Sequence, residues 1–383
     1  MQSTILELKS HDNMKQSNNN NSCERQRLRD KKVRDVLTPD RRRLVEVPYT
    51  ASLAHTMNTL VANRVVAVPV AAPPGHWIGA GGSMILESDK QTGSVRKHYI
   101  GMVTMLDVLS HIAQDDVVRG GCHLDQRMAV PVSEIIGHCL ESLSLWTLNP
   151  NTSIPDCMEV FSKGIHRALV PIDSHMENIA VVELAESASS YRMLTQMDLL
   201  RFLKAHASEP ELRGVMSHTV SQLGGVTGII FGVTHRAKVI QAIKCMRTAA
   251  LNAVPIVEAS SGLREDHSQL INGKGRKLIG TFSSTDLRGC PISEMQSWLQ
   301  ESVLDFTETL SASPSHTAST QVTSPRELVA CRGESNLAEV IDKAVTKQVH
   351  RVWVVDQQGL LDGLVSLTDM ISVTRASLLS ESS

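Results

Sequence analysis

The chain has 383 residues, enough for two domains of ordinary size, and its 38 Lys and Arg nearly balance its 40 Asp and Glu. This balance argues against a protein that binds nucleic acid or anionic membranes, because both attract a basic excess. No apolar run reaches the roughly 18–20 residues of a membrane span. The seven cysteines form no CxxC pair, which indicates reduced thiols in a cytoplasmic or nuclear protein and no metal site.

The N-terminal residues 1–30 are expected to be disordered, because they are weakly hydrophobic and contain the tract Asn18–Asn21. The basic stretch Arg25–Arg43 overlaps their end. We interpret it as a solvated arm that leads into the first domain, with a nuclear-import or docking patch as the alternative.

Farther along the chain, one kind of apolar strand recurs four times, and each copy follows an amphipathic stretch that predicts a helix. The helical faces carry Leu53, Met57, Leu60 and Val61 in the first copy, Val239, Ile240, Ile243 and Met246 in the third, and Leu337, Val340, Ile341, Ala344 and Val345 in the fourth. Ser153 precedes the second helix, and Asn336 with Glu339 resembles a capping box before the fourth. The apolar strands are Arg64–Val70, His166–Ile172, Asn252–Val257 and His350–Val355.

A second kind of segment follows each of these strands. It is a β-rich run that ends in Ser or Thr, then two residues, then an Asp that opens another helix. The four pairs are Thr104 with Asp107, Thr195 with Asp198, Ser283 with Asp286, and Ser366 with Asp369. Their regular recurrence predicts an α/β protein of four tandem β-α-β-β-α repeats.

The predicted boundaries are residues 31–116, 130–206, 213–296 and 326–380, with a linker at 297–325. The polar stretches 73–98, 173–190 and 260–277 are interpreted as insertions at one equivalent hairpin. Because one repeat is too small to cover both faces of its sheet, repeats 1 and 2 should pair into one module and repeats 3 and 4 into another.

The carboxylate of the S/T-x-x-D segment could accept hydrogen bonds from two adjacent hydroxyls, which a ribose offers, and the Ser or Thr adds a short polar group. A single copy is more simply a helix N-cap, but four copies facing the crevices of paired modules favour ribose binding.

Cationic residues open the central strand of repeats 1, 2 and 4. Arginine matches phosphate oxygens in a bidentate manner and histidine can also donate. In a ring of four repeats these side chains would converge on the centre, whereas the alternative is a set of solvated strand ends. They are Arg64, His166, Arg167, His350 and Arg351.

These segments resemble CBS domains, and four in tandem resemble the gamma regulatory subunits of the AMP-activated and sucrose-non-fermenting protein kinases, in the plant gamma-like branch. The likeness is densest over Val349–Met370 and Gly164–Asp173. It implies two Bateman-type modules in a flat disk, AMP, ADP or ATP as regulatory ligands, no required cofactor, and kinase alpha and beta subunits as partners.

The resemblance also implies site residues. Ribose would be held at Asp107, Asp286 and Asp369, and phosphates at the Arg and His positions named above. Met197 and Asp198 replace a Lys-Arg pair of the animal subunits, so that a phosphate contact is lost and a fourth ribose site is gained. Asn252, with Ala253, stands where a small hydroxyl residue is usual, and Thr368 completes the pocket residues.

An enzyme is not expected. The chain has no G-x-S-x-G, no P-loop and no H-R-D motif. A kinase regulatory subunit is the leading hypothesis. There are two alternatives: a stand-alone nucleotide sensor that acts on an unrelated enzyme, and a scaffold with empty pockets.

Overall fold

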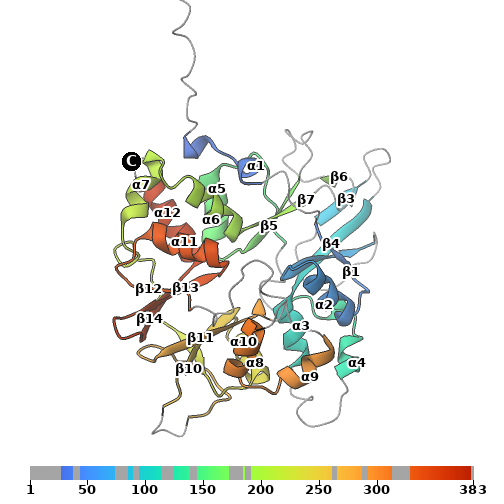
Figure 1. The fold of residues 1–383 in the computed structure, drawn as a ribbon. Coiled ribbons are helices and arrows are strands. Elements are labelled where there is room, and N and C mark those ends of the chain that lie inside the picture. The colour runs from blue at the N-terminus through green and yellow to red at the C-terminus, as the bar shows by residue number, and fades with distance from the viewer. Residues whose placement is uncertain are drawn as a thin grey trace, which may run out of the picture.

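The computed structural model describes residues 27–37, 44–73, 85–88, 95–113, 124–138, 145–171, 184–185, 191–260, 265–286, 292–312 and 328–380. In these ranges the helices and strands follow the expected β-α-β-β-α order in four repeats (Figure 1). None of the helices in the described part is both long and apolar enough to cross a membrane.

Repeats 1 and 2 occupy the first half of the chain. Repeat 1 comprises β1 (Val47–Pro48), α2 (Leu53–Ala62), β2 (Ala67–Ala72), β3 (Ile85–Ser88), β4 (Val95–Thr104) and α3 (Met105–Ile112). Repeat 2 comprises α5 (Ile154–Ser162), β5 (Arg167–Pro171), β6 (Leu184–Ala185), β7 (Tyr191–Thr195) and α6 (Gln196–Ala205). Short helices flank and join them: η1 (Leu28–Asp30), α1 (Val33–Val36), α4 (Leu124–Met128) and η3 (Val132–Glu134).

Repeats 3 and 4 follow after α7 (Pro210–Ser217). Repeat 3 comprises β8 (Phe231–Thr234), α8 (Val239–Thr248), β9 (Ala253–Val257), β10 (Ile271–Asn272), β11 (Leu278–Ser283), η6 (Ile292–Glu294), α9 (Met295–Trp298) and α10 (Val303–Ala312). Repeat 4 comprises β12 (Ala330–Cys331), α11 (Leu337–Lys347), β13 (Arg351–Val355), β14 (Leu361–Ser366) and α12 (Leu367–Ser380).

Two strand pairings recur in the repeats. A parallel pair flanks the first helix, as in β1 with β2, β8 with β9 and β12 with β13, and repeat 2 reduces it to the bridge between Thr147 and Leu169. The second strand then pairs antiparallel with the strand before the last helix. The expected caps are confirmed, because Asn336 Oδ1 accepts the Glu339 N–H at 2.8 Å and Ser153 Oγ accepts the Asp156 N–H at 3.2 Å.

Two expected boundaries are wrong. Leu28, expected in a disordered tail, is fully buried in η1, and its N–H donates to Glu211 at 2.8 Å; residues 1–26 lie outside the described part. The expected linker 297–325 contains α10, whose Val303 and Phe306 are buried in the core that repeats 1 and 3 share. No α-helix begins at Ser283 in the described residues. Instead, α10 packs against α8 and β11 as the second helix of repeat 3.

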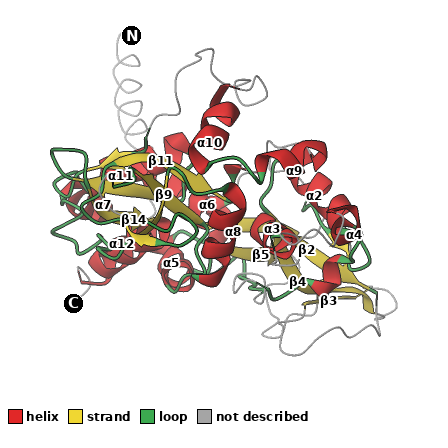
Figure 2. Ribbon diagram, turned by 90° about the horizontal axis from the view of Figure 1, so that it is seen from below, coloured by secondary structure: helices red, strands yellow, loops and turns green. Residues whose placement is uncertain are grey.

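Four apolar cores join the repeats in pairs. Helices form the two larger cores, between repeats 1 and 3, where α3 packs against α8, and between repeats 2 and 4, where α12 packs against α5 and α6. Sheets form the two smaller cores, between repeats 1 and 2 through Tyr99 and Tyr191, and between repeats 3 and 4 through Leu278 and Trp353. The repeats therefore close into a ring in the order 1, 2, 4, 3. The two groups of helices lie on opposite sides of the molecule in Figure 1, and in Figure 2 α7, α11 and α12 lie at the opposite end from α2, α4 and α9.

The connection from repeat 2 to repeat 3 crosses repeat 4 on its way. The Val220 N–H donates to the Ser335 carbonyl at 3.0 Å. Thr227 and Leu364 exchange two backbone hydrogen bonds of 2.9 and 3.0 Å. We name residues 218–228 the crossing segment.

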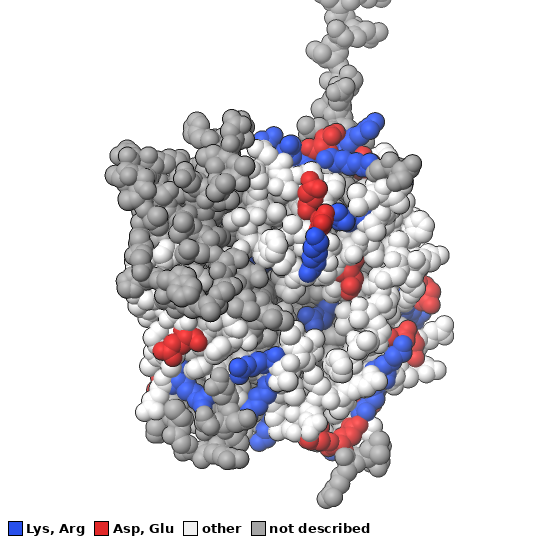
Figure 3. Space-filling view, turned by 180° about the vertical axis from the view of Figure 1, so that it is seen from behind, with Lys and Arg blue, Asp and Glu red and all other residues white. Residues whose placement is uncertain are grey.

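Charged side chains are mixed on the face that Figure 3 shows, where Lys and Arg alternate with Asp and Glu over the coloured surface. On this face the described residues form no extended area of one sign, which agrees with the nearly balanced net charge.

Candidate functional site

The start of the central strand has the same register in all four repeats. Ala67, Arg167, Ala253 and Arg351 pair respectively with Thr104, Thr195, Ser283 and Ser366. The carbonyls of the preceding residues Val66, His166, Asn252 and His350 each accept a backbone hydrogen bond from the residue that follows this hydroxyl residue. The His-Arg pairs of repeats 2 and 4 are therefore equivalent, and Asn252-Ala253 takes their place in repeat 3.

The expectation that Arg64 opens the first central strand in this register is wrong. Ala67 holds the arginine position of repeat 1, and Arg64 lies three residues before it with a left-handed backbone at φ 54°. Gly164, Ala250 and Gln348 occupy the same place in the other repeats, with φ of 86°, 53° and 54°. The sequence pattern had aligned Arg64, a turn residue, with residues that begin a strand.

Three of the four expected acids form a capping box with their hydroxyl partner. Oδ2 of Asp107 accepts the backbone N–H of Thr104 at 2.7 Å and its hydroxyl at 2.6 Å. The corresponding bonds are 2.9 and 2.7 Å for Asp198 with Thr195, and 2.8 and 2.6 Å for Asp369 with Ser366. Asp286 accepts the Ser283 N–H at 2.8 Å, whereas the Ser283 hydroxyl bonds to Thr285 at 2.9 Å.

Burial separates the four acids. Asp107, Asp198 and Asp286 are at most 4% exposed, whereas Asp369 is half-buried. Oδ1 of Asp198 also accepts a hydrogen bond from Arg201 at 3.0 Å, so a cation of its own helix already neutralises this acid. Asp369 is therefore the most accessible of the four expected ribose-binding acids, and Asp198 faces an internal competitor.

A hydroxyl-to-carboxylate bond at a helix start does not by itself identify a binding site. Exposed Asp156 accepts the Ser153 hydroxyl at 2.6 Å, and exposed Asp305 accepts the Ser302 hydroxyl at 2.7 Å, at helices that do not follow a central strand. What distinguishes the repeated acids is their place at the carboxyl end of a strand, beside the start of the central strand.

Three repeats meet at Arg351. Its Nη1 donates to the Ala253 carbonyl of repeat 3 at 2.6 Å, while its Nε is buried without a hydrogen-bond partner. Burial lowers the pKa of Arg351 to about 10, which still leaves the guanidinium charged at neutral pH. Burial, and then the charge of Arg351, lower the pKa of His166 of repeat 2. His166 and Arg351 thus lie close enough to interact electrostatically, while the convergence of the whole expected set stays a prediction.

Thr368 contacts a neighbouring repeat rather than standing open in a pocket. Its hydroxyl accepts a hydrogen bond from Gln196 Nε2 at 2.9 Å, and the same amide donates to the Phe161 carbonyl at 3.0 Å. Gln196 is 5% exposed and joins α6 to α12. The sequence analysis missed Gln196 and Arg201. The spacing of three residues between Asp198 and Arg201 on a helix was the available signal for the latter.

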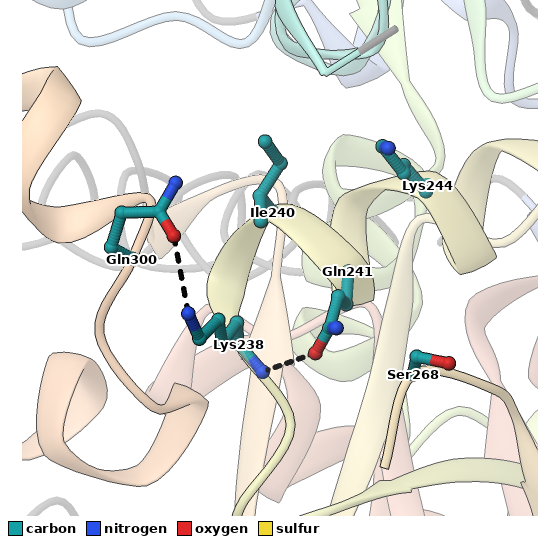
Figure 4. Close-up of a pocket in the computed structure, with 6 residues that line it drawn as sticks. All are labelled: Lys238, Ile240, Gln241, Lys244, Ser268 and Gln300. Atoms are coloured by element: carbon teal, nitrogen blue, oxygen red, sulfur yellow. Dashed lines mark hydrogen bonds between the residues drawn. The ribbon is translucent and has the colours of Figure 1, made fainter. Parts of the chain in front are cut away.

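A hollow of about 340 Å³ lies beside α8, and none of the residues that line it is an expected site residue (Figure 4). In the close-up, Lys238 Nζ donates to Gln300 Oε1 at 3.3 Å, and the Lys238 N–H donates to Gln241 Oε1 at 3.1 Å. These bonds cap α8 and join it to the segment after α9. Among the described residues, no group of three or more His, Cys, Asp or Glu is arranged to hold a metal ion.

Comparisons with known proteins agree with this geometry. The CBS domain family matches residues 321–375, which is the region of repeat 4. The chain is 60% identical over 89% of its length to the SNF1-related protein kinase regulatory subunit gamma-like PV42a of Arabidopsis thaliana, covering 94% of that protein. It is 58% identical over 92% of its length to PV42b of the same plant, covering 97% of it.

A solved structure shares the fold at low sequence identity. A protein of Methanocaldococcus jannaschii, described as a candidate archaeal homologue of the AMP-activated protein kinase gamma subunit, superposes with a TM-score of 0.57 at 15% identity. The match covers 89% of this chain and 99% of that one.

Fold and register thus define an α/β protein of four CBS repeats. The chain belongs to the plant family of SNF1-related protein kinase regulatory subunit gamma-like proteins. This family is regulatory and not catalytic, as the sequence analysis expected.

Proposed function

We propose that the chain binds adenine nucleotides between its CBS repeats and thereby tunes the assembly or activity of a heterotrimeric kinase. The observation that carries this proposal is the meeting of His166, Arg351 and the Ala253 carbonyl from three repeats. A phosphate bound there would contact several repeats at once, and would therefore favour one arrangement of the ring.

Two features support adenine nucleotides as the ligands. The acids at the strand ends lie beside the central strands that carry the cations, so a ribose and its phosphates would follow one another toward the centre. Asp369 is the most accessible of these acids, so the repeat 4 pocket, with Ser366, is the first candidate for AMP, ADP or ATP.

Calorimetry with AMP, ADP and ATP tests the proposal on the full chain. Asp369→Ala should weaken binding of the preferred nucleotide at least about tenfold, because it removes charge-assisted hydrogen bonds to the ribose. Asp156→Ala is the matched control, since it removes a similar hydroxyl-to-carboxylate bond at the start of α5 and should leave the affinity unchanged. Equal losses in both variants, or no binding to the unaltered chain, would contradict the nucleotide proposal.

The partners would be a kinase catalytic alpha subunit and a beta subunit, in the cytoplasm or the nucleus. Affinity capture from plant extract should recover both subunits. Recovery of an unrelated enzyme alone would favour the stand-alone sensor, and recovery of the kinase without any nucleotide binding would favour a scaffold.

A further inference from the structure

Histidine and arginine side chains gather between repeats 1 and 3, apart from the central-strand positions. His111 of α3 and His138 stack with ring centroids 6.2 Å apart and planes inclined by 21°. Arg127 of α4, which is 8% exposed, donates from Nη1 to the His111 carbonyl at 3.0 Å. Arg247, in the last turn of α8, is close enough to act electrostatically on both imidazoles. Four donor groups thus come together where α3 packs against α4 and α8.

This cluster contains polar atoms that nothing in the described part of the chain satisfies. The Nδ1 atoms of His111 and His138 are buried without a hydrogen-bond partner. The hydroxyl of Ser110, the residue before His111, is also buried without a hydrogen-bond partner, and Ser110 is 1% exposed. Because buried polar atoms are costly when unpaired, their coincidence indicates a site completed by a ligand.

The charges around the two rings favour an anion over a cation. Burial is the first cause that lowers the pKa of both histidines, and for His111 the charges of His138, Arg127 and Arg247 add to it. Arg247 alone adds to it for His138. Glu134 acts in the opposite direction on His111, and Asp107 on His138. Oδ2 of Asp107 is held by Thr104 in its capping box. The two guanidinium groups thus disfavour a metal ion at the rings and supply the positive charge that an oxyanion needs.

We propose that His111, His138, Arg127 and Arg247 form a second anion site, which takes a small phosphate-bearing ligand at the contact between repeats 1 and 3. The ligand oxygens accept hydrogen bonds from the imidazole Nδ1–H groups and from Arg247. Its negative charge stabilises the protonated rings, so binding takes up protons and tightens as the pH falls. The site does not depend on the nucleotide pocket of repeat 4, because it shares no residue with it.

NMR of the full chain with labelled histidine tests the site, with sulfate as the probe because sulfate keeps its charge between pH 6 and 7.5. The His111 and His138 signals should shift saturably with sulfate, with higher affinity at pH 6. Arg247→Gln should weaken this binding about tenfold. Arg213→Gln, which alters an exposed arginine on α7, is the matched control and should change nothing. Signals that do not move, or equal losses in both variants, would overturn the site.

Two further measurements extend the test. The first identifies the source of the phosphate, and the second uses another variant in case Arg247→Gln does not fold. Inorganic phosphate and AMP are titrated separately into the chain and into Asp369→Ala. Histidine shifts that persist with either ligand in Asp369→Ala support a separate site, whereas shifts that require Asp369 assign them to the nucleotide pocket and refute it. Arg247→Lys keeps the charge if Arg247→Gln unfolds, and it should bind sulfate more weakly than the unaltered chain because the bidentate geometry is lost.

Discussion

At the residue scale, the left-handed position before each central strand explains both the regularity of the repeats and one error of prediction. The chain turns there from helix to strand, and three of the four repeats place a residue other than glycine in a conformation that costs roughly 1–2 kcal/mol for L-residues. In the sequence, Arg64 and Arg167 are both arginines that precede an apolar run. Only the backbone conformation shows that Arg64 is a turn residue and that Arg167 begins a strand.

Replacing Arg64 by glycine should therefore stabilise the protein. Arg64→Gly is expected to raise the free energy of unfolding by about 1 kcal/mol, because glycine adopts positive φ without a steric penalty. Gly164→Ala is the reverse experiment and should lower it by a similar amount; a Cβ at Gly164 would meet no atom within 4 Å, so backbone strain alone is measured. Urea unfolding measures both. A loss of stability in Arg64→Gly would mean that the arginine side chain outweighs the strain.

The histidines predict a loss of stability in mild acid. The pKa values of His111, His138 and His166 are lowered in the folded chain, so the unfolded chain binds protons first as the pH falls below 6.5. The free energy of unfolding should accordingly decrease from pH 7 toward pH 5. Hydrogen bonds with Arg276 lower the pKa of Glu265 to about 2. Carboxylates of this kind retain their contribution to stability over this pH window.

Urea unfolding at several pH values checks this slope. His166→Gln should make it shallower, whereas His55→Gln, on an exposed face of α2, should leave it unchanged. A stability that rises toward pH 5 would contradict the assignment of neutral histidines.

At the element scale, the amphipathic periodicity predicted the first helix of each repeat, and the S/T-x-x-D segments predicted the start of α3, α6 and α12. The third copy differs, because the Ser283 hydroxyl bonds to Thr285 and the residues directly after Asp286 lie outside the described part; α10 packs against α8 and β11 in this repeat. Periodicity also reports that a face is buried but not which element covers it. The pairing of helices between repeats 1 and 3, and between repeats 2 and 4, was therefore visible only in the structure.

The contact between α6 and α12 offers a test of that pairing. Gln196→Ala should lower the free energy of unfolding by roughly 1–3 kcal/mol, because it leaves the Phe161 carbonyl and the Thr368 hydroxyl without their shared donor. Gln300→Ala, which removes an exposed amide bonded to Lys238, should cost far less. Denaturant unfolding compares the two, and equal effects would show that the buried amide contributes no more than a surface contact.

At the scale of the whole molecule, sheet cores and helix cores alternate around the ring, so neither half of the chain possesses a complete core. Residues 1–207 and 208–383, expressed separately, should each lack a cooperative thermal transition, whereas the full chain should unfold in a single one. Calorimetry measures this, and two independent transitions in the full chain would restore the picture of two self-sufficient modules.

The crossing segment ties the timing of folding to the order of synthesis. It leaves the ribosome well before Ser335, in the turn ahead of α11, and Leu364 of β14, which bind Val220 and Thr227, so its partners do not exist when it first emerges. Repeat 3 follows directly. Its sheet face, which packs against repeat 4, therefore stays unpacked until the last residues are made. A chain that stops short of β14 would therefore leave the ring open at two seams, although three complete repeats had already been translated.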